Sequence, residues 1–385
     1  MRDLVEIGMG RSARRSYSFD DVEIVPSRRT RSSRVVSTEW QIDAYRFDIP
    51  LITHPTDAIV SPAMAVRIGK LGGLGVLNAE GLWTRHEGVD KLLFQLTSAI
   101  TEADDAAAMR LLQQWHAAPI RVELLAEAIG QVAESGVTVA ARVSPQHARD
   151  LTPDLLAAGV EILVVQGTIV SAEHVSRGLH GPQGRDGGAE PLNLEEFIAS
   201  MDVPVIVGGV GDYRTAMHLM RTGAAGVIVG YGAGASSSTA DVLGIGVPMA
   251  TAVADAAAAR RDYLDETGGR YVHVIADGGV RTSGDIAKAI GCGADAVMLG
   301  EPLAVAAEAP ANGLYWTAAA AHPSLPRSHV IDVAAGSIGI DTLLFGPSSD
   351  PSGHVNLFGA LRRAMAKTGY SELKEFQKVG LTVRS

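Results

Sequence analysis

Two glycine-containing loops in this sequence of 385 residues carry residue types that could bind or transform a ligand. The first follows an apolar run at 226–229 and contains Gly230, Gly232 and Gly234. Their backbone amides and carbonyls are free to converge on an anion or a monovalent cation. A row of four hydroxyl side chains, at 236–239, comes next. The same composition is also typical of a polar surface loop without a ligand.

The second loop region, 272–300, reads as strand, glycine turn, helix and strand. The turn is Asp277-Gly278-Gly279, Ser283 is the expected N-cap of the helix at 284–290, and Gly300 closes the last strand. In (β/α)8 barrels, the loops after strands seven and eight build a phosphate site. We therefore expect Gly278, Gly279 and Gly300 to lie against a phosphorylated ligand.

Strand-like apolar runs alternate with helical patterns along the chain, which indicates a parallel α/β architecture. Eight such runs are found, at 49–53, 75–78, 138–143, 161–166, 203–208, 226–230, 272–275 and 296–299. We predict an α/β fold of the (β/α)8 TIM-barrel type in a single domain.

The predicted barrel divides the chain into four parts. An N-terminal arm and pre-barrel segment would cover 1–48, the barrel 49–310, an irregular segment resembling a lid 311–360, and helices packed on the barrel 361–385. The stretch from 80 to 134 reads as helical and is too short for an inserted regulatory domain.

Composition and charge exclude several classes of function. A net charge of −10 argues against nucleic-acid and anionic-membrane partners, which need a basic surface. The single cysteine, Cys292, excludes an intramolecular disulfide and is expected to be a small buried apolar residue. Without a signal peptide or an apolar run long enough to span a bilayer, a cytoplasmic location is expected.

Five stretches in order resemble the IMP dehydrogenase and GMP reductase family, and in particular its short branch without CBS domains. They are YSFDDVEIVP, IPLITHPTDAIVSPAMA with GGLGVLN, VGYGAGASSSTADVLGIGVPM, ADGGVRTSGDIAKAIGCGADAVMLG, and LRRAMAKTGYSELKEFQKV. The resemblance covers nearly the whole chain. It implies a homotetramer that binds a purine nucleotide (IMP, XMP or GMP) or another phosphorylated small molecule, with NAD or NADP as the hydride carrier.

The resemblance also assigns roles to individual residues. Asp277 matches an aspartate that accepts hydrogen bonds from ribose hydroxyls, and Gly279 and Gly300 match glycines whose amides hold a 5′-phosphate. Gly232 and Gly234 match glycines whose carbonyls can bind potassium.

Other matched positions carry different residues from those usual in the family. Thr53 and Thr56 fall in the substrate-binding region after the first strand, with Thr56 in place of a methionine beneath the base. Gln166 and Thr168 stand where the family has an aspartate and a histidine-rich turn near the nicotinamide. Glu301 follows Gly300 where a serine or glycine would help to hold phosphate, and would repel a dianion.

The most consequential difference is Ser237, which occupies the position of the family's nucleophilic cysteine, two residues before Thr239. A hydroxyl needs an adjacent base to act as a nucleophile, whereas a thiol is already partly ionised near neutral pH. His54 could be that base or a structural histidine at a strand end. The sequence at 311–360 also lacks the arginine and tyrosine pair that activates water in the dehydrogenases.

Three functions follow as alternatives. The chain could be a nicotinamide-linked oxidoreductase acting on a purine nucleotide, although without the usual covalent step. It could bind such a nucleotide for regulation or assembly without turnover. It could also be an FMN-binding barrel, because the phosphate loops of FMN enzymes resemble the stretch at 278–300.

Overall fold

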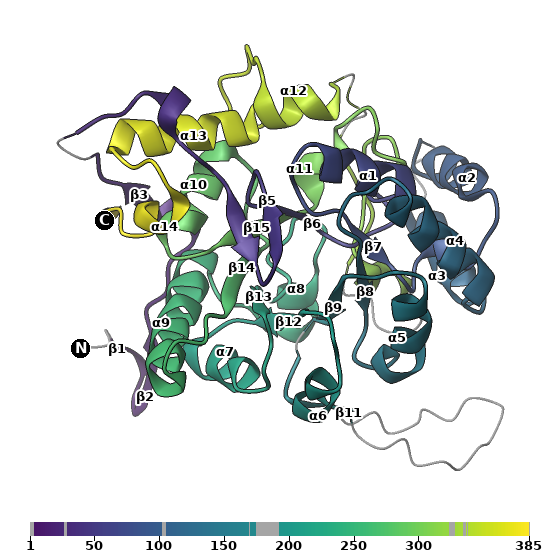
Figure 1. The fold of residues 1–385 in the computed structure, drawn as a ribbon, viewed down its shortest axis with the longest axis horizontal. Helices are drawn as coiled ribbons and strands as arrows, with labels where there is room; N and C mark the ends of the chain where they lie inside the picture. The colour runs from purple at the N-terminus through teal and green to yellow at the C-terminus, as the bar shows by residue number, and fades with distance from the viewer. Residues whose placement is uncertain are drawn as a thin grey trace.

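The computed structural model describes residues 4–26, 29–101, 105–168, 170–174, 192–322, 328–333, 336 and 338–384. Within these residues, eight parallel strands form a barrel in the order β6-β15-β14-β13-β12-β9-β8-β7 (Figure 1). A parallel bridge between Ile52 and Leu74 joins β6 to the start of β7 and closes the ring. The predicted (β/α)8 TIM barrel is confirmed.

Each of the eight predicted runs overlaps a barrel strand, and β12 and β14 each extend two residues past the predicted end. The strands are β6 (Leu51–Thr53), β7 (Val76–Asn78), β8 (Ala140–Val143), β9 (Ile162–Gln166), β12 (Val205–Val210), β13 (Gly226–Val229), β14 (His273–Asp277) and β15 (Ala296–Leu299). Most are buried on both faces, which explains why they read as continuous apolar runs and not as alternating ones.

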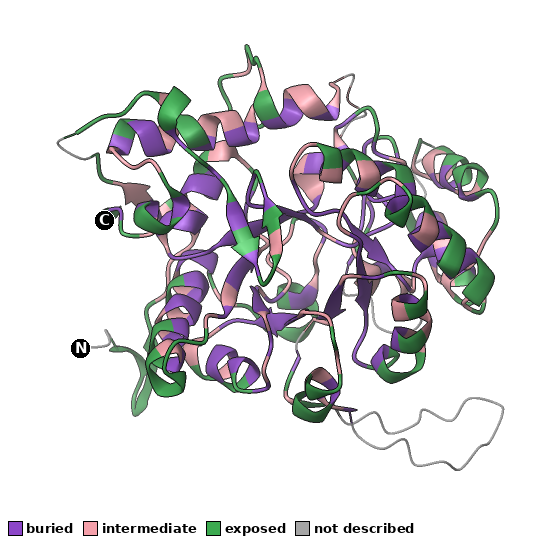
Figure 2. Cartoon of the chain, viewed as in Figure 1, coloured by how far each residue is buried: buried purple, intermediate pink, exposed green. Residues whose placement is uncertain are grey.

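Helices surround the barrel, with their buried sides toward the strands and their exposed sides toward solvent (Figure 2). They include α1 (Pro62–Lys70), α2 (Val89–Thr101), α3 (Asp105–His116), α4 (Val122–Ala133), α5 (Ala148–Ala157), α6 (Leu194–Ala199), α7 (Tyr213–Met220), α8 (Thr239–Leu243), α9 (Met249–Thr267), α10 (Ser283–Gly291) and α11 (Glu301–Ala304). In the described part of the chain, no helix is both long and apolar enough to cross a membrane.

The N-cap predicted for α10 was wrong by one residue. Thr282, not Ser283, is the cap, because its hydroxyl accepts the amide hydrogen of Asp285 at 3.2 Å. The Asp285 carboxylate in turn accepts the amide of Thr282 at 3.0 Å. This reciprocal pair requires a side-chain acceptor three residues after the N-cap. Asp285 is three residues after Thr282 but only two after Ser283.

A hairpin of β4 (Trp40–Ile42) and β5 (Tyr45–Phe47) covers the amino-terminal end of the barrel. Trp40 and Phe47 stack with ring centroids 5.1 Å apart, and Ile42 is fully buried near the start of β13. Nearby, the buried Asp295 carboxylate binds Arg260 and Lys374, each at 2.6 Å, which ties the C-terminal segment to the barrel.

The segments outside the barrel are more ordered than the sequence indicated. The N-terminal arm contains an exposed hairpin, β1 (Leu4–Gly8) and β2 (Arg11–Arg14). The part expected to be irregular, 311–360, contains α12 (Ile340–Phe345) and a pairing of β16 (Leu314–Tyr315) with β17 (Ile331–Asp332). At the end of the chain are α13 (Leu357–Thr368), α14 (Leu373–Phe376), and β18 (Leu381–Val383), which pairs with β3 (Val22–Ile24).

Candidate functional site

A cavity of about 880 Å³ opens at the carboxyl ends of the barrel strands. This is the end at which the loops of (β/α)8 barrels build active sites. Predicted site residues that end or follow five of the strands line it together: His54, Gln166, Thr168, Gly232, Gly234, Ser237, Thr239, Asp277, Gly278, Gly279 and Gly300. Residues 315 and 317–319 cover one side of it.

Asp277, at the end of β14, is held by two side chains from other strands. The Gln166 amide donates to one carboxylate oxygen at 2.8 Å, and Nδ1 of His54 lies 3.2 Å from the other. Because a carboxylate only accepts, Nδ1 must carry the proton in this pair, and Nε2 is then an acceptor when the ring is neutral. The carboxylate is therefore fixed in orientation, with lone pairs left for a ligand.

Glycine is required around Asp277 because the backbone is crowded there. Gly278 and Gly279 have φ values of 101° and 68°, which side chains rarely allow, and a Cβ on Gly278 would lie 2.9 Å from that of Ala233. A Cβ on Gly300 would collide with the hydroxyl of Tyr315. The missing side chains let a ligand approach the backbone amides at this end of the cavity, here called the glycine end (Gly278, Gly279, Gly300 and Glu301).

In the described part of the chain, Ser237 has no base hydrogen-bonded to it. Its hydroxyl donates to that of Thr239 at 3.2 Å and accepts the Thr239 amide at 3.3 Å. Within the described residues, no histidine, lysine or carboxylate forms a hydrogen bond or ion pair with Ser237. The loop is also held from outside, since the amide of His329 donates to the carbonyl of Ser236 at 2.9 Å. This arrangement does not activate a serine nucleophile.

Cys292 cannot replace the missing nucleophile. It is the C-cap of α10, outside the cavity lining, and burial raises the pKa of its thiol to about 11. The side chain is half-buried and not fully buried as expected. The cavity lining of the described residues thus contains no thiol.

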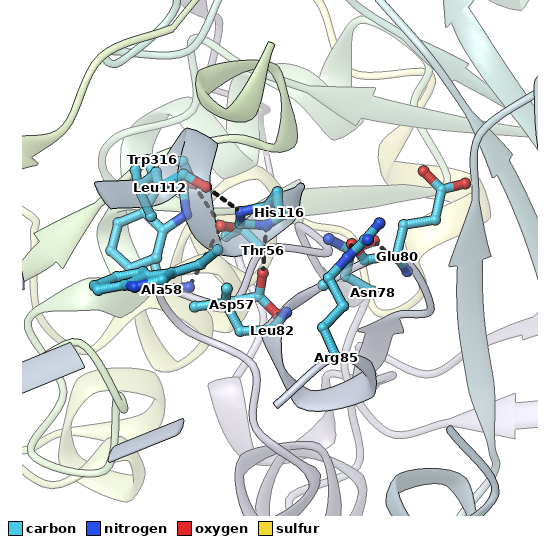
Figure 3. Close-up of polar contacts among 12 residues, drawn as sticks. Thr56, Asp57, Ala58, Asn78, Glu80, Leu82, Arg85, Leu112, His116 and Trp316 are labelled. Carbon is cyan, nitrogen blue, oxygen red and sulfur yellow. Dashed lines mark hydrogen bonds and ion pairs between the residues drawn. The ribbon is translucent and has the colours of Figure 1, made fainter. Parts of the chain in front are cut away.

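The structure corrects the placement of Thr53 and Thr56, which the sequence assigned to substrate binding. Thr53 is fully buried, and its hydroxyl accepts the amide of Val76 at 2.8 Å. Thr56 donates to the carbonyl of Trp316 at 2.5 Å and is 1% exposed (Figure 3). Neither lines the cavity, so both position the backbone around it.

A charged cluster on the opposite side of the cavity was missed by the sequence analysis. Glu80 lies two residues after β7, and Arg142 is the last residue but one of the neighbouring strand β8. Their side chains approach to 3.3 Å. Arg142 also donates to the Gln166 carbonyl at 2.6 Å, and Arg85 lies beside Glu80 (Figure 3). The carboxyl ends of neighbouring parallel strands meet at one edge, a rule that could have revealed this pair. We call Glu80, Arg85, Arg142 and His147 the arginine end.

Glu80 is ionised despite its burial. Burial alone would raise the pKa of its carboxyl, but the charge of Arg142 and hydrogen bonds from His147 and Ser144 lower it to about 2. The same contact with Glu80 raises the pKa of His147. The cluster is therefore a fixed array of charges that holds the loops after β7, β8 and β9 in place.

A second polar contact joins α3 to the cavity wall. His116, which lines the cavity, lies 3.5 Å from the buried carboxylate of Asp57, and its other ring nitrogen is 2.8 Å from the carbonyl of Leu112 (Figure 3). Asp57 also accepts the amide of Leu82 at 3.0 Å. The next residue to His116 on the same side of α3, Gln113, donates to the carbonyl of His322 at 2.9 Å. In this way α3 supports the segment that covers the cavity.

Within the described residues, no group of three or more histidine, cysteine, aspartate or glutamate side chains could hold a metal ion.

The family model described as the IMP dehydrogenase / GMP reductase domain matches residues 16–322, which include all of the barrel strands. The chain belongs to the IMP dehydrogenase/GMP reductase family. The glycine end, Asp277 and Ser237 all lie within the matched range.

Relatives of this family member are similar along the whole chain. An uncharacterized oxidoreductase of Mycolicibacterium smegmatis is 63% identical over 385 residues, covering 99% of this chain and 100% of the relative. One of Mycobacterium tuberculosis (strain ATCC 25618 / H37Rv) is 61% identical over 383 residues, covering 99% and 100%. The inosine-5′-monophosphate dehydrogenase of Methanocaldococcus jannaschii is 24% identical over 471 residues, covering 95% and 92%.

A solved structure is also similar over nearly the whole fold. The IMP dehydrogenase/GMP reductase-like protein from Corynebacterium glutamicum is 55% identical, with a TM-score of 0.92, and the match covers 99% of this chain and 98% of that one. The relatives from Mycolicibacterium smegmatis and Mycobacterium tuberculosis are both named as oxidoreductases.

Proposed function

We propose that this family member binds a purine ribonucleotide or ribonucleoside in the barrel cavity, with Asp277 accepting the ribose hydroxyls. The observation that carries the proposal is the fixed carboxylate of Asp277, held by Gln166 and His54 beside the glycine end. A charged acceptor whose position is set before binding suits a vicinal diol, because each hydroxyl can donate to it. The amide of Gly300 would then face the 5′ end of the ligand, whereas the amide of Gly279 donates to the carbonyl of Ala233 at 3.1 Å.

We propose NAD or NADP as the second ligand of the same cavity. A volume of about 880 Å³ leaves room beyond a nucleoside, and the arginine end offers cations for anionic groups of a dinucleotide. Gln166 and Thr168 line the space between the two ends and would contact the nicotinamide part. When bound, the nicotinamide would accept or donate a hydride. The backbone of Gly232 and Gly234 could hold a monovalent cation in addition.

Binding without turnover is the second candidate. It is favoured by the surroundings of Ser237, which has no base among the described residues, and by the lack of a thiol in the described cavity lining. The covalent step usual in the family, which the serine at position 237 already made unexpected, has no support in these residues. An FMN ligand, the remaining alternative, would colour the purified protein yellow.

The exposed apolar residues Leu4, Ile7 and Met9 of the N-terminal hairpin suit the proposed homo-oligomer.

Calorimetric titration with IMP, XMP, GMP and inosine tests the proposal directly. We expect saturable binding of at least one of them. The ligand that binds would then be incubated with NAD or NADPH, and absorbance would be followed at the nicotinamide band. Nicotinamide turnover would establish the oxidoreductase, and binding without turnover the second candidate. Failure of all four purines to bind would contradict both.

Changing Ser237 to cysteine is expected to leave IMP oxidation close to the wild-type rate, within about tenfold. Among the described residues, the new thiol would still have no base or cation hydrogen-bonded to it, because its hydrogen-bond neighbour is Thr239. The rate of NADH formation checks this, with Ser237→Ala as the control for the loss of the hydroxyl. A large gain in turnover in the cysteine variant alone would contradict our account of the site.

A further inference from the structure

Glu301 places an unpartnered carboxylate at the glycine end of the cavity. It follows Gly300 directly, at the first position of α11, and its half-buried side chain lines the cavity. Among the described residues it takes part in no hydrogen bond and no ion pair. A carboxylate that is partly removed from water without a partner is costly, so a donor brought by a ligand would relieve it.

Tyr315 is an independent sign that a polar ligand group belongs here. Its side chain lines the cavity and is only 3% exposed, and its hydroxyl lies against Gly300. The described residues form no hydrogen bond with that hydroxyl. Buried hydroxyls are nearly always hydrogen-bonded, so this one is expected to pair with a ligand.

The charge around these two residues is negative. Asp277 and Asp20 line the same end of the cavity, and the one arginine of its lining there, Arg281, lies 3.2 Å from Asp20. Burial raises the pKa of the Glu301 carboxyl more than the charges of Arg281 and His354 lower it. Tyr315 adds no charge, because burial and the nearby carboxylates of Asp277 and Glu301 raise the pKa of its hydroxyl well above the usual value.

The two ends of the cavity therefore differ in what they can bind. At the arginine end, Arg142 and His147 contact the carboxylate of Glu80, and the guanidinium of Arg85 donates to the backbone carbonyl of Glu80. The glycine end contains the carboxylate of Glu301 and has two more beside it, those of Asp277 and Asp20. The one arginine of the lining there is already paired with Asp20. A phosphate dianion at the glycine end would be repelled, whereas an uncharged hydroxyl could donate to Glu301 and interact with the hydroxyl of Tyr315.

We propose that Glu301 makes the glycine end of the cavity select an uncharged, hydroxyl-bearing group, such as the 5′-hydroxyl of a purine ribonucleoside, over a phosphate dianion. This inference rests on the proposed function, since it assumes that the ribose lies on Asp277. It assigns Glu301 as a specificity-determining residue. The favoured ligand is a nucleoside and not a nucleotide.

Calorimetric titration of the full chain with inosine and with IMP at pH 8 tests the inference. We expect the wild type to bind inosine at least as tightly as IMP. Glu301→Gln is expected to raise the affinity for IMP by about tenfold or more, because the variant removes one charge near the phosphate. Its affinity for inosine should stay the same or fall. Glu266→Gln, which removes an equal charge outside the cavity lining, is the matched control and should change either affinity by less than about threefold.

The pH dependence provides a second measurement. Protonation of Glu301 removes the repulsion, so the affinity of the wild type for IMP should rise from pH 8 to pH 5.5, while the affinity for inosine should not. Part of this rise in affinity comes from protonation of the phosphate of IMP itself, whose second pKa is about 6. Glu301→Gln keeps only that part, and its pH dependence should therefore be shallower than that of the wild type.

Two results would overturn the inference. If the wild type binds IMP more than tenfold more tightly than inosine at pH 8, and Glu301→Gln leaves that ratio unchanged, Glu301 does not set the specificity, although the proposed function stands. If neither purine binds to the wild type at either pH, the proposed function fails and the inference fails with it.

Discussion

Replacing Asp295 by alanine is expected to lower the free energy of unfolding by about 3–5 kcal/mol, because it leaves the buried Arg260 without its counter-charge. The side chain is 2% exposed and accepts hydrogen bonds from Arg260 at 2.6 Å, Lys374 at 2.6 Å, Tyr271 at 2.8 Å and the amide of Val274 at 2.8 Å. The Arg260 and Lys374 charges hold the pKa of this carboxyl well below its usual range, although burial opposes them. The loss would therefore be greatest near neutral pH, where the carboxylate is ionised.

Urea unfolding of the full chain, followed by circular dichroism, measures this loss. Asp295→Asn preserves the shape and part of the hydrogen bonding, and should be destabilised less than the alanine variant. The control is Glu266→Ala, which breaks the exposed pair of Arg221 and Glu266 and should leave unfolding nearly unchanged. Equal stability of Asp295→Ala and the wild type would show that the cluster does not hold the C-terminal segment to the barrel.

The barrel could be predicted from the sequence because its determinants are local. Each strand is a short apolar run that is buried on both sides, and each ends at or near a turn or helix signal. The position of Asp277 at the end of such a run was enough to place it at the carboxyl end of the barrel. The helix α12 was missed because its six residues lie between Gly339 and Gly346 in a segment without clear periodicity.

The contacts of the site were harder to predict because they join distant positions. Thr56 bonds to a carbonyl 260 residues away, and nothing near it in the sequence distinguishes a buried structural hydroxyl from a ligand-binding one. Thr53 is the last residue of β6, but its hydroxyl accepts from the neighbouring strand and not from the cavity. Gln166 and Asp277 lie on strands that are not adjacent, so their contact depends on the diameter of the closed barrel.

Replacing Asp277 by alanine is expected to reduce the affinity for a purine ribonucleoside by about 100-fold, since two hydroxyl groups would lose a charged acceptor. The variant also removes the partner of His54 and of the Gln166 amide, whose own carbonyl oxygen is buried without a partner. Titration with inosine and with 2′,3′-dideoxyinosine identifies the lost contact. The wild type should prefer inosine, and Asp277→Ala should bind the two nucleosides equally. Asp20→Ala, which removes an exposed carboxylate of the same cavity, should keep the wild-type preference. If Asp277→Ala retained that preference, the ribose would have to lie elsewhere in the cavity, because the ribose hydroxyls would then contribute to the binding free energy without this carboxylate.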